Sequence, residues 1–149
     1  MDHRRTLREE TEMTDRELLN MAFDAMENAY APYSGLRVGA ALECADGSVF
    51  LGCNVENASF SDTICAERTA VVKAVSEGRR SFRRLAVAAA SEEYCMPCGS
   101  SLQVLREFSE DMEILAAKKD GHYVSYRLNA LLPRVSIKEE MDGMLRRSE

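Results

Sequence analysis

The first third of the chain carries a helical pattern of apolar residues that gives way to extended patterns further on. One apolar stripe recurs every three or four positions and comprises Leu18, Leu19, Met21, Ala22, Ala25, Met26 and Ala29. This spacing predicts an amphipathic helix. Thr14, with Glu17 three residues later, has the sequence of a capping box and predicts where that helix begins. The helix should end near Tyr30, because Pro32 disfavours helical backbone just before it.

Five short apolar segments, separated by turn residues, are predicted to be strands. They cover residues 38–44, 49–53, 84–90, 112–117 and 122–128. Asp46-Gly47 and Lys119-Asp120-Gly121 have the composition of hairpin turns. The segment 84–90 is apolar throughout after its first residue, which indicates a strand in the middle of the sheet.

Two further helices are predicted to begin at Cys65 and at Cys98. The first should end at Gly78, because glycine readily takes the left-handed backbone that closes a helix. A single helical turn is expected over residues 129–132. The charged tail after Ser136 should be helical or frayed.

The predicted order of elements is α-β-β-α-β-α-β-β, which favours an α/β fold. We expect a three-layer α/β/α sandwich around one mixed five-stranded sheet. Residues 1–13 are polar and without period, so a loose N-terminal arm should precede a single domain over residues 14–149. The helices at Cys65 and Cys98 both follow strands closely, and the ends of strands are where such sheets place their binding sites.

Composition and charge narrow the range of functions. The net charge of −6 argues against a nucleic-acid-binding surface, which needs clustered Lys and Arg. No apolar run approaches the ~20 residues of a membrane span, and the N-terminus lacks the apolar core of a signal peptide. Five cysteines, an odd number, are atypical of a disulfide framework. We therefore expect a cytoplasmic protein with reduced thiols.

Two short motifs carry the candidate chemistry. Cys65-Ala66-Glu67 and Pro97-Cys98 each open a predicted helix. A C-x-E motif followed by P-C-x-x-C resembles the signature of zinc-dependent nucleoside and nucleobase deaminases. In this chain Ser101 stands where the second cysteine of P-C-x-x-C is expected.

Longer segments extend the resemblance to one family. They read A-Y-A-P-Y-S-G-L-R-V-G-A-A-L, G-C-N-V-E-N-A-S-F, C-A-E-R-T-A and A-L-L-P, in this order from about Leu18 to Pro133. In these segments the chain resembles the small homotetrameric cytidine deaminases. The resemblance implies a homotetramer and a zinc-dependent hydrolase that acts on a cyclic amidine. Its substrate would be a pyrimidine nucleoside such as cytidine or deoxycytidine, deaminated in pyrimidine salvage.

The same resemblance implies roles for individual residues around the metal. Cys65 and Cys98 match two zinc ligands, and Glu67 matches the group that moves protons between water and substrate. Arg68 matches an arginine that balances the charge of the thiolates. From the residues alone, Glu67 could instead be a first-turn glutamate favoured by the helix dipole, and Arg68 could be a surface arginine.

Further residues match substrate contacts. Asn54 and Glu56 correspond to ligands of the ribose hydroxyls, and Tyr33 and Leu36 lie in a segment next to the substrate. The alternative for Asn54 and Glu56 is a turn formed by an asparagine and a solvated glutamate. The remaining cysteines, Cys44 and Cys53, are interpreted as buried strand residues.

The chain departs from the family pattern at several positions. Ser101 is a poorer zinc ligand than a thiolate, and Leu102 replaces the usual arginine. Leu36 replaces a usual phenylalanine, and residues 134–136 lack the usual aromatic. Cys95 could supply a substitute ligand, because Cys95 and Cys98 have a ligand-like spacing.

Two functions therefore remain open from the sequence. The first is zinc-dependent deamination, weakened or altered by Ser101. The second is a non-catalytic relative that binds a nucleoside or serves as an oligomer subunit.

Overall fold

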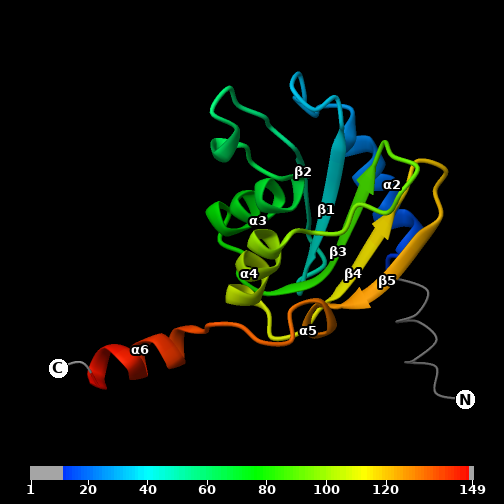
Figure 1. Ribbon diagram of the computed structural model, residues 1–149. Helices are drawn as coiled ribbons and strands as arrows, with labels where there is room; N and C mark the ends of the chain where they lie inside the picture. The colour runs from blue at the N-terminus through cyan, green and yellow to red at the C-terminus, as the bar shows by residue number, and fades with distance from the viewer. Residues whose placement is uncertain (1–11, 148–149) are drawn as a thin grey trace, which may run out of the picture.

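The computed structural model describes residues 12–147 (Figure 1). Its elements are α2 (Asp15–Met26), β1 (Val38–Cys44), β2 (Val49–Cys53), the 3₁₀ turn η1 (Phe60–Asp62), α3 (Ala66–Ser76), β3 (Phe82–Ala89), α4 (Gly99–Phe108), β4 (Glu113–Ala117), β5 (Tyr123–Arg127), α5 (Leu128–Leu131) and α6 (Lys138–Arg147). The loose arm expected over residues 1–13 lies, apart from Glu12 and Met13, outside the described residues. No helix among the described residues is both long and apolar enough to cross a bilayer.

The strands form one mixed five-stranded sheet in the order β2-β1-β3-β4-β5. Only β3 and β4 run parallel, and every other neighbouring pair is antiparallel. A parallel pair needs a crossover between its strands, and α4 supplies it. The predicted mixed sheet is confirmed.

Side chains on the two faces of the sheet enter two separate hydrophobic clusters. Leu42 of β1 packs with α3 and α4, whereas its neighbour Ala41 packs with α2. Such alternation follows from the two-residue period of a strand. Figure 1 shows α2 on one side of the sheet and α3 with α4 on the other. The predicted three-layer α/β/α arrangement is therefore confirmed.

The start of α2 follows the predicted capping box. The Glu17 backbone N–H donates to Thr14 Oγ1 at 3.1 Å, and the Thr14 N–H donates to Glu17 Oε2 at 3.2 Å. The helix ends at Met26 and not near Tyr30, so that boundary was wrong. Tyr30 is held instead in a β-bridge with Val55, where its N–H donates to the Asn54 carbonyl at 2.9 Å.

Two glycines let helices approach the sheet closely. A Cβ at Gly39 would lie 2.0 Å from the Ala22 carbonyl oxygen, and one at Gly52 would lie 2.3 Å from the Ala66 carbonyl oxygen. Any larger residue would therefore push a helix away from its strand. Because Ala66 is the first residue of α3, Gly52 fixes the position of the helix end that carries Cys65 and Glu67.

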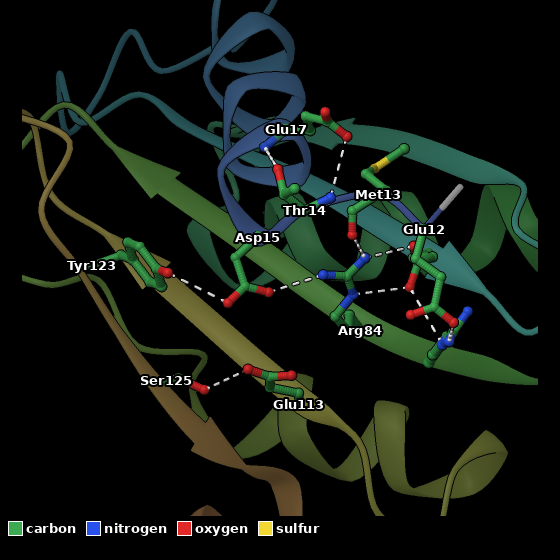
Figure 2. Close-up of polar contacts among 11 residues, drawn as sticks. Glu12, Met13, Thr14, Asp15, Glu17, Arg84, Glu113, Tyr123 and Ser125 are labelled. Carbon is green, nitrogen blue, oxygen red and sulfur yellow. Dashed lines mark hydrogen bonds and ion pairs between the residues drawn. The ribbon is translucent and has the colours of Figure 1, made fainter. Parts of the chain in front are cut away.

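An arginine on β3 ties the beginning of α2 to the sheet (Figure 2). Arg84 makes two charged hydrogen bonds to the buried Glu43, at 2.9 and 2.8 Å. It also donates to Asp15 at 2.9 Å and to the Met13 carbonyl at 2.7 Å. The contacts with Arg84 are the shortest ion pairs of the buried Glu43 carboxylate, whose other partner, Arg83, lies 3.9 Å away. Leaving a buried carboxylate poorly paired costs several kcal/mol.

Several element boundaries differ from the predictions by one or two residues. Strand β3 begins at Phe82, not Arg84, because Phe82 pairs with Cys44 and packs on Phe108 with ring centroids 5.5 Å apart. The final helical turn, α5, begins one residue early at Leu128. The charged tail contains a helix, α6.

Candidate active site

A cavity of about 270 Å³ lies where the beginnings of α3 and α4 meet two irregular segments. Its lining consists of Ser34, Leu36, Val38, Asn54, Glu56, Phe60, Thr63, Cys65, Ala66, Glu67, Cys95, Met96 and Cys98. Seven of the residues singled out in the sequence are among them: Leu36, Asn54, Glu56, Cys65, Glu67, Cys95 and Cys98. Ser101 contacts Cys98 and Glu67 of this lining, and Arg68 contacts Cys65. The Tyr33 backbone N–H donates to Glu56.

The two thiols are placed by helix geometry. Cys65 is the N-cap of α3 and Cys98 the N-cap of α4, both in extended backbone conformation. Burial alone would raise the pKa of the Cys98 thiol. Hydrogen bonds from the backbone and hydroxyl of Ser101, the backbone of Ser100 and the side chain of Cys65 outweigh this, so its pKa lies below the ordinary value. The shift is in the direction that favours the thiolate, which is the form in which cysteine binds a metal.

Arg68 lies directly beside the first thiol. Its Nη2 donates to Cys65 Sγ at 3.2 Å, and this hydrogen bond is the main reason why the pKa of the Arg68 guanidinium is raised. The charges of Cys98 and Glu67 act in the same direction. Arg68 Nε is buried and has no hydrogen-bond partner among the described residues. This position suits a cation that balances negative charge on the two sulfurs.

Ser101 is fully buried one turn into α4, between the second thiol and Glu67. Its Oγ lies 3.6 Å from Cys98 Sγ and donates to Glu67 Oε2 at 3.4 Å. Residues at positions i and i+3 share one face of a helix, which brings Ser101 to the same side as Cys98. Cys98, Ser101 and Glu67 are thus linked by contacts through the Ser101 hydroxyl, and Cys65 lines the same cavity.

One pair of the candidate donors, Cys98 and Ser101, has the separation of two zinc ligands. A sulfur ligand at about 2.3 Å and an oxygen ligand at about 2.1 Å in a tetrahedral zinc site lie about 3.6 Å apart. Cys98 Sγ and Ser101 Oγ are separated by 3.6 Å. Cys98 and Ser101 are thus spaced as two zinc ligands are, and Cys65, which lines the same cavity, could complete the set.

In charge, the same donor set falls short. The Ser101 hydroxyl is neutral, whereas a third thiolate would add a negative charge and a softer donor. Within residues 12–147 there is no group of three or more His, Cys, Asp or Glu side chains arranged to hold a metal ion. The spacing thus allows zinc, and the donor chemistry predicts a lower affinity.

Glu67 occupies the first turn of α3 and faces the cavity. Its side chain is buried, and burial raises its pKa above the ordinary value, although its own backbone N–H, the Ser101 hydroxyl and Arg68 act in the opposite direction. A carboxyl group with a raised pKa can both accept and return a proton near neutral pH. The position matches the proton-transfer role implied by the sequence.

Asn54 and Glu56 also line the cavity and make hydrogen bonds to the segment 33–38. Asn54 accepts from the Val38 N–H at 2.9 Å and donates to the Leu36 carbonyl at 2.8 Å. Glu56 accepts from the Tyr33 and Ser34 N–H groups at 3.0 Å each, and also from the Ser34 hydroxyl, whose hydrogen bond is the main cause of the lowered pKa of Glu56. Both side chains therefore stabilise the segment that carries Leu36.

Some lining residues were not found from the sequence. Phe60 contributes apolar surface from the 3₁₀ turn η1 and Met96 from the loop before α4, and neither periodicity nor a motif marks them. Cys95 also lines the cavity, and its pKa is raised by burial and then by the charges of Glu67, Cys65 and Cys98. Leu102 is buried in the hydrophobic core beside α3.

Comparisons with known proteins agree with this geometry. The family model of the cytidine and deoxycytidylate deaminase zinc-binding region matches residues 12–117. The chain is 46% identical over 118 residues to the cytidine deaminase of Sporosarcina psychrophila, covering 78% of this chain and 87% of that protein. It is 43% identical over 130 residues to that of Halalkalibacterium halodurans, covering 86% and 98%.

Solved structures lead to the same family. The crystal structure of cytidine deaminase from Burkholderia pseudomallei superposes with a TM-score of 0.80 at 41% identity. It covers 83% of this chain and all of that chain. Cytidine deaminase from Mycobacterium tuberculosis superposes with a TM-score of 0.72 at 36% identity, covering 83% and 98%. On these matches and the arrangement around Glu67, the chain belongs to the cytidine and deoxycytidylate deaminase family.

Proposed function

We propose that this protein hydrolyses cytidine or deoxycytidine to the corresponding uridine and ammonia, as its relatives are named for doing. The observation that carries the proposal is the convergence of Cys65, Cys98 and the Ser101 hydroxyl with Glu67 at one cavity. The chemistry that zinc supplies in such a site is a hydroxide nucleophile at neutral pH. Glu67 takes a proton from the attacking water, passes it to N3 of the pyrimidine and assists the departure of ammonia.

The rest of the cavity binds and orients the nucleoside. Asn54 and Glu56 are the groups within it that suit ribose hydroxyls, because each keeps unused hydrogen-bonding capacity beyond the contacts to its own chain. Tyr33 supports Glu56 through its backbone N–H. Leu36 and Phe60 offer apolar surface to the base.

We also propose a homotetramer of single-domain chains, located in the cytoplasm. Two adjacent segments near the cavity expose large apolar side chains, namely Tyr30, Tyr33, Val55, Phe60 and Ile64. Exposed apolar surface of this kind marks an interface between chains. Light scattering should give a mass of four chains, and a stable monomer at micromolar concentration would contradict the assembly.

Incubation with cytidine and deoxycytidine tests the reaction. We expect conversion to uridine and deoxyuridine, followed by chromatography, with Glu67→Gln inactive while still binding the nucleoside. The neutral hydroxyl of Ser101 favours one alternative: a non-catalytic family member that binds a nucleoside. Calorimetric binding of cytidine without any conversion by zinc-saturated protein would support that alternative and overturn the proposal.

A further inference from the structure

One wall of the cavity is a loop that leads from β3 to α4. Its residues 91–96, called the wall loop below, contribute Cys95 and Met96 to the lining. Cys98 follows two residues after Met96 and lines the cavity together with Glu67. The wall loop therefore borders the part of the cavity that contains Glu67. Because the loop belongs to no helix or strand, its position depends on contacts with neighbouring segments.

Hydrogen bonds hold the first half of the wall loop. Just before it, the Ala90 N–H donates to the Arg37 carbonyl at 3.1 Å. The Ser91 carbonyl then accepts from the Lys119 N–H at 2.8 Å, in the turn between β4 and β5. Within the loop, Ser91 Oγ accepts from the Glu93 N–H at 3.1 Å. The loop is therefore attached to the β4–β5 turn at its first residue, and Figure 1 shows the two side by side.

A side-chain contact with the same turn holds the second half of the wall loop. Lys118, the residue that follows β4, places its Nζ 5.2 Å from the centre of the Tyr94 ring. A cation within about 6 Å of the ring centre is attracted to the face of the ring. Because 39% of Tyr94 is exposed, packing holds this side chain only in part. Cys95 follows directly in the chain, so the contact acts next to the residues that line the cavity.

The turn that carries Lys118 is itself firmly held. The Lys118 N–H donates to the His122 carbonyl at 3.0 Å, and the Gly121 N–H donates to the Lys118 carbonyl at 2.9 Å. On its other side, Arg16 of α2 donates to the Gly121 carbonyl at 3.0 Å and lies 5.3 Å from the centre of the Tyr123 ring. The turn is thus fixed to both the sheet and α2, and it can hold the wall loop in place.

We propose that Lys118 is a positioning residue for the nucleoside base. Through its contact with Tyr94 it keeps Cys95 and Met96 in place as a wall against the base, and so raises the affinity for the nucleoside. Lys118 acts through the loop and does not touch the substrate. This inference rests on the proposed function, which supplies the nucleoside as the ligand and places the reacting end of the base at Glu67.

Steady-state kinetics of the full chain with cytidine tests the role of Lys118. A cation over an exposed aromatic ring contributes about two- to fivefold to an equilibrium constant. Lys118→Ala should therefore raise KM by about this factor and leave kcat nearly unchanged, because Glu67 belongs to α3 and not to the wall loop. Tyr94→Leu should have the same effect, and the double variant should add little to either single one.

Conservative and control variants separate positioning from a general loss of structure. Lys118→Arg and Tyr94→Phe each keep a cation over a ring, so both should restore the KM of the unmodified protein. Lys119→Ala is the matched control: it removes a positive charge from the same turn but keeps the backbone N–H that bonds the Ser91 carbonyl. Its KM should equal that of the unmodified protein. Circular dichroism establishes that each variant is folded.

Hydrogen exchange measures the wall loop directly, without nucleoside or turnover. Mass spectrometry should show amide exchange over residues 91–96 about two- to fivefold faster in Lys118→Ala and unchanged in Lys119→Ala. Unchanged exchange in Lys118→Ala would show that the contact does not hold the loop. Faster exchange with an unchanged KM would show that the loop does not set the affinity. Either result would overturn the proposal.

The failure of this inference is distinct from a failure of the proposed function. A protein that forms no uridine contradicts the proposed function, and the calorimetric Kd for cytidine then takes the place of KM. The same two- to fivefold weakening in Lys118→Ala would support the positioning role. An unchanged Kd, or no binding of cytidine to the unmodified protein, would overturn it.

Discussion

Replacing Ser101 by cysteine should strengthen zinc binding about a hundredfold. The Ser101 side chain is fully buried, with its Oγ 3.6 Å from Cys98 Sγ, so a thiol placed there faces the metal position. Structural zinc sites bind with ~10–16 kcal/mol over four ligands, or roughly 3 kcal/mol for each. Since 1.4 kcal/mol is a factor of ten, restoring one ligand is worth on the order of 100-fold in Kd.

The same substitution has a small cost in the metal-free protein. It removes the hydrogen bond from Ser101 Oγ to Glu67 Oε2. A hydrogen bond of this kind contributes about 1 kcal/mol, so the variant should remain folded. The zinc effect can therefore be measured on an intact protein.

Competition against a chromophoric chelator measures the zinc Kd of both proteins. Ser100→Cys is a matched control, because Ser100 is exposed at the neighbouring position of α4 and a thiol there adds no ligand to the cavity. We expect substoichiometric zinc in the unmodified protein and one zinc per chain in Ser101→Cys. Equal, tight binding in both would refute the reasoning and indicate another third ligand, with Cys95 the first residue to examine.

Three further predictions concern catalysis and stability. Glu67→Gln should reduce kcat by at least ~10²-fold with little change in nucleoside affinity, because proton transfer is removed and the cavity is retained. Steady-state kinetics measures the rate and calorimetry the affinity, and an unchanged rate would contradict this role of Glu67. Burial raises the pKa of Glu67 in the folded, metal-free protein above its pKa in the unfolded chain. The raised pKa therefore stabilises the fold fully at pH values below the pKa of the unfolded chain, and this stabilisation is lost as pH rises through the pKa of the folded protein. The free energy of unfolding of Glu67→Gln should therefore increase relative to that of the unmodified protein as pH rises toward neutrality, as measured by urea titrations at several pH values. A difference in unfolding free energy that does not change with pH would count against a buried carboxylate. Arg84→Ala should cost about 3–5 kcal/mol of unfolding free energy, since Glu43 is left buried with only the longer ion pair to Arg83, at 3.9 Å. The exposed neighbour Arg83→Ala should cost far less, and similar losses in the two would show that Glu43 does not depend on Arg84.

Local physical rules made much of the fold predictable. The capping box at Thr14, the helix stop at Gly78 and the placement of Cys65 and Cys98 at helix starts each depend on residues close together in sequence. The mixed sheet followed from the order of apolar segments, and the motifs led to the family. These features needed no knowledge of long-range contacts.

The remaining features depend on contacts between distant segments. The end of α2 at Met26 follows from the bridge between Tyr30 and Val55, which no local pattern contains. The contact of Ser101 with Glu67 joins positions 34 residues apart, so the sequence marked Ser101 as a departure without showing its partner.

The cavity wall illustrates the same limit. The sequence indicated two candidate roles for Asn54, a local structural role and a substrate contact. Its hydrogen bonds to Leu36 and Val38, however, required the fold.

The most direct test of the account is a zinc titration of cytidine turnover. The protein is stripped of metal, then given increasing zinc, while uridine formation and bound zinc are measured on the same sample. The account predicts that uridine forms in proportion to bound zinc and that Glu67→Gln binds the metal without forming uridine. If zinc-saturated protein and zinc-saturated Ser101→Cys both leave cytidine unchanged, the convergence of Cys65, Cys98, Ser101 and Glu67 is not a deaminating centre.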